Sequence, residues 1–63
     1  MYKIKYYNSE GKEETKRVNG YISAVNIARQ MANKNRRVSF IYSETFEGWK
    51  LTARITPNME HFT

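Results

Sequence analysis

The stretch YISAVNIARQMANKN, from Tyr21 to Asn35, places apolar side chains at the spacing of an amphipathic helix. Its apolar stripe consists of Tyr21, Ala24, Val25, Ala28, Met31 and Ala32, and polar residues fill the opposite side. Three alanines on that stripe would let the helix backbone approach a sheet closely, because small side chains leave little between the two backbones. Asn19 and Gly20 are residues that cap a helix, and Asn35 can adopt the left-handed conformation that ends one. The stretch therefore predicts one helix of about four turns.

The segment before the helix predicts a hairpin. YKIKYY, residues 2–7, alternates in the manner of a strand, and NSEGK then suits a type I turn followed by a left-handed Gly11. The second strand, about residues 12–18, is polar and should therefore lie at a sheet edge. The turn sets a register that pairs Tyr7 with Glu13, Lys5 with Thr15, Lys3 with Arg17, and Tyr2 with Val18.

Two more strands follow the helix. RRVSFIYSE, residues 36–44, and GWKLTARIT, residues 48–56, both alternate with a period of two, and the short SETFEG between them predicts a hairpin with Phe46 at its tip. The larger apolar residues should face the helix in both strands. Besides residues of the first strand and the helix, the expected core therefore includes Phe40, Tyr42, Trp49, Leu51, Ala53 and Ile55.

The element order β-β-α-β-β predicts a small α+β domain with one helix packed on one face of a four-stranded antiparallel sheet. A right-handed crossover over the first strand gives the strand order 2-1-3-4. We expect a single domain over residues 1–57, and a flexible C-terminal tail over residues 58–63, because Pro57 ends the last strand.

Charge and composition narrow the classes of partner. The 63-residue chain has a net charge of +5, which favours anionic partners through long-range attraction. It contains no cysteine, which fits a reducing compartment, and no apolar run of the roughly 20 residues that a membrane span requires. The sequence therefore predicts a cytoplasmic protein that does not enter membranes.

The sheet face without a helix is the candidate binding surface. In the expected register only Glu13 opposes six cations there, accompanied by Thr15, Ser39, Ile41 and Thr52. Lys and Arg can neutralise phosphates, and a tyrosine ring can stack on a base. The candidate nucleic-acid-binding residues are Lys3, Lys5, Tyr7, Arg17, Arg37, Lys50 and Arg54.

The sequence contains few residues that could support catalysis or metal binding. The chain has no Cys or Asp, and its single His, His61, lies in the expected tail. No Ser, Lys or Glu can be tied to that His by spacing, and scattered Glu residues do not make a ligand cluster. We therefore expect a non-catalytic protein without a metal site or a cofactor.

Two functions remain open at this point. The first is a module that binds nucleic acid, single strands in particular, with modest sequence selectivity through the uncovered sheet face. The second is a protein-interaction module that acts as a regulator, adaptor or inhibitor through Phe46, the tail or a sheet edge, and that could form a homodimer.

Overall fold

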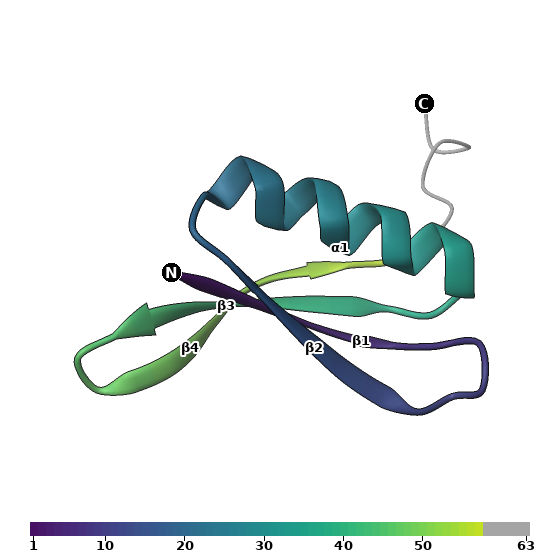
Figure 1. Ribbon diagram of the computed structural model, residues 1–63, viewed down its shortest axis with the longest axis horizontal. Helices are drawn as coiled ribbons and strands as arrows, with labels where there is room; N and C mark the ends of the chain where they lie inside the picture. The colour runs from purple at the N-terminus through teal and green to yellow at the C-terminus, as the bar shows by residue number, and fades with distance from the viewer. Residues whose placement is uncertain (58–63) are drawn as a thin grey trace.

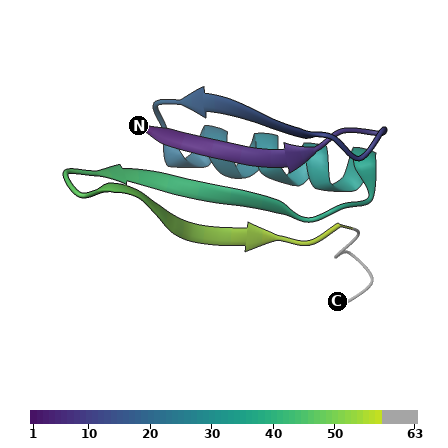
Figure 2. The same cartoon turned by 90° about the horizontal axis from the view of Figure 1, so that it is seen from below.

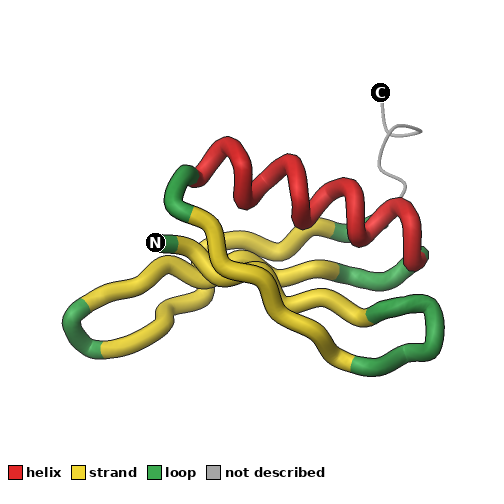
Figure 3. Tube along the Cα trace, viewed as in Figure 1, coloured by secondary structure: helices red, strands yellow, loops and turns green. Residues whose placement is uncertain are grey.

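The computed structural model describes residues 1–57, so the expected tail, residues 58–63, lies outside the described part of the chain. The elements are β1 (Tyr2–Tyr7), β2 (Glu13–Val18), α1 (Tyr21–Asn35), β3 (Ser39–Thr45) and β4 (Gly48–Ile55). They form one four-stranded antiparallel sheet in the order β2-β1-β3-β4, with α1 lying across one face (Figures 1 and 3). The predicted fold class and strand order are therefore confirmed.

The helix packs on the sheet through its alanines. Ala24, Ala28 and Ala32 are fully buried, whereas Asn26 and Arg29 on the other side of α1 are exposed. Beneath them lie Ile4 of β1 and Ile41 of β3, also fully buried, and Tyr6 of β1 completes the buried apolar cluster together with Ala24 and Ala28. The predicted helix face is confirmed.

The helix ends one residue later than expected. Asn35 remains helical, and Arg36 adopts the left-handed conformation, with φ of 58°. The backbone N–H of Arg37 then donates to the carbonyl of Ala32 at 3.3 Å, which closes a Schellman-type end. The sequence prediction chose Asn35 because asparagine adopts the left-handed conformation more often than arginine does. It was wrong by one position.

The β1–β2 hairpin has the predicted register. Tyr7 lies opposite Glu13, Lys5 opposite Thr15, and Tyr2 opposite Val18. The N–H of Gly11 donates to the carbonyl of Asn8 at 2.9 Å, and Gly11 has φ of 82°, as the type I turn with a left-handed glycine requires.

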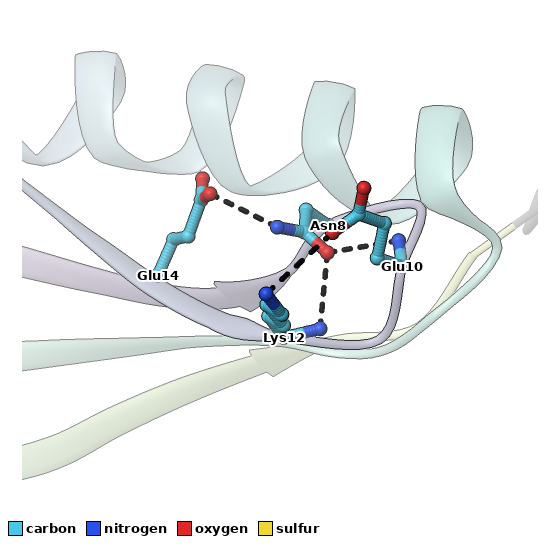
Figure 4. A network of polar contacts seen from close by, with 4 residues as sticks. All are labelled: Asn8, Glu10, Lys12 and Glu14. Atoms are coloured by element: carbon cyan, nitrogen blue, oxygen red, sulfur yellow. Dashed lines mark hydrogen bonds and ion pairs between the residues drawn. The ribbon is translucent and has the colours of Figure 1, made fainter.

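Polar contacts hold this hairpin end together (Figure 4). The Asn8 side-chain oxygen accepts hydrogen bonds from the backbone N–H groups of Glu10, at 2.9 Å, and Lys12, at 3.0 Å. Asn8 Nδ2 donates to one carboxylate oxygen of Glu14 at 3.0 Å, and the hydroxyl of the buried Tyr6 donates to the other at 2.9 Å. These two donors, Asn8 first, hold the pKa of Glu14 below its ordinary value.

Strand β3 presents the opposite side from the one expected. Ile41 lies directly across from Ile4, so Ile41 and Ser39 face α1, and Phe40 and Tyr42 lie on the uncovered face. The fully buried residues of α1 are all alanines, so the helix lies close to the sheet, and the buried ring on this side is Tyr6 of β1. The prediction placed the larger residues of β3 inward, and it was wrong because the pairing of Ile41 with Ile4 fixes the side on which Phe40 and Tyr42 lie.

Strand β4 changes phase in its middle. Ile41 lies opposite Ala53, but the next residue, Tyr42, lies opposite Leu51, so Thr52 is the extra residue of a β-bulge. Ala53 and Ile55 therefore face α1 as predicted, while Leu51 lies on the uncovered face and is 51% exposed. The expectation that Leu51 is buried was wrong.

The close contact between α1 and the sheet generates the first prediction. Ala28→Glu would bury a carboxylate between the two layers, so we expect the variant to be unfolded at room temperature. Asn26→Glu is the matched control, because it adds the same charge to the exposed side of α1. Thermal melts followed by circular dichroism decide it, and equal melting temperatures would contradict this helix packing.

The second prediction concerns acid stability. Because the folded state lowers the pKa of Glu14, its contribution is present above the ordinary Glu pKa of about 4.3 and is lost as the pH falls through the lower folded-state value. Glu14→Gln should therefore destabilise the protein at neutral pH and make its melting temperature fall less steeply on acidification. The control is Glu10→Gln, which removes an exposed carboxylate 3.8 Å from Lys12 Nζ. Identical pH profiles for Glu14→Gln and the native protein would refute this account.

Candidate nucleic-acid interface

The uncovered sheet face carries rings and cations in ordered rows across the strands. Figure 2 views the strands from this side, with α1 behind them. Cross-strand pairing defines two central rows, each with one residue from β2, β1, β3 and β4 in turn. The first row is Thr15, Lys5, Phe40 and Arg54, and the second is Arg17, Lys3, Tyr42 and Leu51. We call these eight residues the central rows.

Trp49 of β4 lies beside the second central row, on the side of the β3–β4 turn, and its ring contacts cations of β1 and β2. It pairs with Glu44 of β3, and its ring extends back over the sheet. Lys3 Nζ of β1 lies 4.7 Å from the centre of the indole, and Arg17 Cζ of β2 lies 5.5 Å from it. Both distances are those of cation–π contacts, so a β4 side chain holds cations from β1 and β2.

Lys5 and Lys3 make further contacts with the rings of β3. Lys5 Nζ lies 5.3 Å from the centre of the Phe40 ring and 5.7 Å from that of Tyr42, and Lys3 Nζ lies 5.5 Å from that of Tyr42. Hydrogen bonding with the Tyr42 side chain is the main reason that the pKa of Lys5 is raised above its ordinary value. Lys5 is therefore fully charged at neutral pH, and the face alternates cations with half-buried rings.

Five of the seven predicted binding residues lie on this face. Lys3, Lys5, Arg17 and Arg54 are in the central rows, and Tyr7 lies beside them on β1, opposite Glu13. Their role in binding remains a prediction.

The other two predicted residues lie elsewhere. Lys50 pairs with Ser43, whose neighbour Tyr42 is on the uncovered face, so the prediction that Lys50 shares that face was wrong. The cause is again the bulge at Thr52, whose hydroxyl donates to Ser43 Oγ at 2.8 Å on the same side as Lys50. Arg37 precedes β3, and its guanidinium lies against the β1–β2 turn beside Gly11.

The sequence reasoning missed three of the four rings on this face. Phe40, Tyr42 and Trp49 were assigned to the core by size. Pairing β3 with β1 so that Ile41 meets Ile4 would have placed Phe40 and Tyr42 outside, since alternation then fixes their side. Trp49 gave no such signal, because a bulge leaves the alternating pattern of letters unchanged.

The charge of the face differs from the expectation as well. Four cations, Lys3, Lys5, Arg17 and Arg54, replace the six expected, and Glu44 joins Glu13 on the face in the described part of the chain. The overall excess is therefore smaller than predicted. The central rows nevertheless hold all four cations and neither acid, so the positive charge is concentrated around Phe40 and Tyr42, while Tyr7 and Trp49 lie opposite Glu13 and Glu44.

Residues 1–57 show neither a metal centre nor a membrane-spanning helix. Residues 1–57 contain no group of three or more His, Cys, Asp or Glu side chains placed to hold a metal ion. Within that range, α1 is too short and too polar to cross a membrane. Comparisons with protein-family models, with curated proteins and with solved structures found no match.

The contact between Lys3 and Trp49 generates the third prediction. A double-mutant cycle with Lys3→Met and Trp49→Leu should show a coupling of about 0.5–1 kcal/mol in the free energy of unfolding, the range of exposed cation–π pairs. The control cycle replaces Lys3→Met with Lys50→Met, because Lys50 neighbours Trp49 in sequence but lies on the other face. Equal coupling in the two cycles would show that the indole does not hold Lys3.

Proposed function

We propose that the protein is a non-catalytic module that binds nucleic acid, single strands in preference to duplex, with modest sequence selectivity through its uncovered sheet face. The observation that carries the proposal is the alternation of Lys3, Lys5 and Arg17 with the rings of Phe40, Tyr42 and Trp49. Single-strand binding requires both kinds of group, cations for the phosphates and rings for the bases.

The cation–π contacts suggest how binding would proceed. In the free protein the cations cover the rings at distances of 4.7–5.7 Å. A base that stacks on a ring takes the place of a cation, and the freed cation then reaches a phosphate of the same strand. Bases in a duplex are already stacked on one another, so this exchange favours unpaired nucleotides.

Charge argues for an anionic partner over a second copy of the chain. Two such faces packed together would bring the four cations of one set of central rows against those of the other, at a Coulomb cost.

The exchange of a cation for a base requires no metal or cofactor. With a cysteine-free chain, the cytoplasm is the compartment we propose.

A protein partner is the second candidate, and one residue favours it. Phe46 at the tip of the β3–β4 hairpin is 100% exposed, and the hairpin extends past the start of α1 (Figure 1). Exposed rings are frequent anchors in protein interfaces. Glu44 and Glu47 flank Phe46, so this tip is unsuited to phosphates and any partner there would be a protein.

The fourth prediction tests the binding face. Labelled single-stranded DNA and RNA are titrated at low and at physiological salt with two double variants that remove equal charge. Lys5→Gln with Arg54→Gln should weaken binding and reduce the salt slope by about 1.4, at roughly 0.7 for each phosphate that is no longer neutralised. Lys50→Gln with Arg29→Gln, both off the face, should bind nearly as well as the native protein.

The rings have their own readout in the same titrations. Trp49→Leu should cost about 1–3 kcal/mol on single strands and much less on duplex, provided that its melt shows a folded protein. Phe46→Ser should leave nucleic-acid affinity unchanged. If the native protein binds no more tightly than the roughly 0.1 mM typical of non-specific contacts, the proposal is wrong and the protein partner becomes the leading candidate.

A further inference from the structure

Building on the proposed function, we infer that the ligand is a short unpaired segment, such as a loop or a strand end, that crosses the four β-strands along the central rows and places two or three bases on the rings. The positions of the charges along and across the sheet carry this inference.

Across the strands most of the face is favourable to a nucleic acid. Arg17 lies on β2, Lys3 and Lys5 on β1, and Arg54 on β4, with Phe40 and Tyr42 of β3 between the β1 and β4 cations. Each row has a cation at one sheet edge, Arg54 in the first and Arg17 in the second, so a chain that crosses obliquely from one row to the other meets cations at both edges and rings in the middle. Six of the eight central-row positions therefore offer either phosphate neutralisation or stacking, the exceptions being Thr15 and Leu51.

Along the strands the face is closed at both ends by acids. Glu13 lies beyond one central row, at the end near the β1–β2 turn. Glu44 lies beyond the other, toward the β3–β4 turn at the opposite end of the sheet (Figures 2 and 3). A strand running lengthwise would bring phosphates to one of these carboxylates, and like charges repel. The acids therefore favour the crossing direction.

The width of the sheet sets the length of the segment. Three spacings separate β2 from β4, which at about 4.8 Å each gives roughly 14 Å between the outer cations. Sheets of comparable size in RNA-binding modules stack two or three bases. Because β2 and β4 are edge strands, nucleotides beyond this width meet no further part of the sheet face.

A length series tests the segment directly. Affinity of the native protein for labelled oligothymidylates of two to ten nucleotides should rise steeply up to about four nucleotides. Beyond that length it should rise only slightly, because a longer strand offers more positions at which four nucleotides can bind. A loop of four thymidines closed by a duplex stem should bind about as well as the free four-nucleotide strand. A steady gain in affinity up to ten nucleotides would overturn the inference while leaving nucleic-acid binding intact.

Four variants test the direction with the four-nucleotide strand. Arg54→Gln should weaken binding about fivefold to tenfold at low salt, as removal of one phosphate-neutralising cation does, whereas Lys50→Gln on the same strand should not. Glu13→Gln and Glu44→Gln should change affinity less than about twofold at physiological salt, since off-path charges are screened. A lengthwise path predicts the reverse, with Arg54 neutral and a clear gain in affinity from one of the Glu variants. Absence of binding at every length would instead reject the proposed function itself.

Discussion

The rest of the structure depends on the close contact between α1 and the sheet. Ala24, Ala28 and Ala32 bring the helix close to the sheet, and the side chains buried beneath it are Ile4, Tyr6, Ser39 and Ile41. The cost is visible at Ser39, whose buried hydroxyl has no hydrogen-bond partner among the described residues. Among the described residues this thin interior buries one ring, that of Tyr6, and the rings of Phe40, Tyr42 and Trp49 lie on the other face. The candidate interface is therefore a consequence of how the core is packed.

The cations on that face have two roles in the free protein. Lys3 and Arg17 keep the Trp49 ring half-buried, although the ring lies on a surface that no helix covers. Aliphatic stems of Lys and Arg shield apolar surface while their charged ends stay in water. An open sheet face rich in rings would otherwise invite self-association, so the same groups that we propose to bind phosphates also keep the free face hydrated.

The sequence was sufficient where local chemistry decides the structure. Asn8 and Gly11 determine a turn type, the turn determines the β1–β2 register, and the helical stripe of alanines identifies the buried side of α1. It was insufficient for β3, where both alternating sets contain apolar residues and only the pairing with β1 selects between them. For the candidate site, the positions of the cations Lys3, Lys5, Arg17 and Arg54 could be predicted from the sequence. The three rings were not, because their side depends on packing and on a bulge.

The bulge at Thr52 makes the pairing of β4 as important as its composition. Trp49 and Ala53 are four residues apart, a spacing that a regular strand would place on one face, and the bulge between them places them on opposite faces. Deletion of Thr52 would return β4 to a regular ladder and leave the indole on the uncovered face, because the two residues would then be three positions apart. A slip of the β3–β4 pairing that removes the bulge but keeps Thr52 would instead carry the indole to the helix side, so this surface tolerates loss of the extra residue better than loss of the bulge alone.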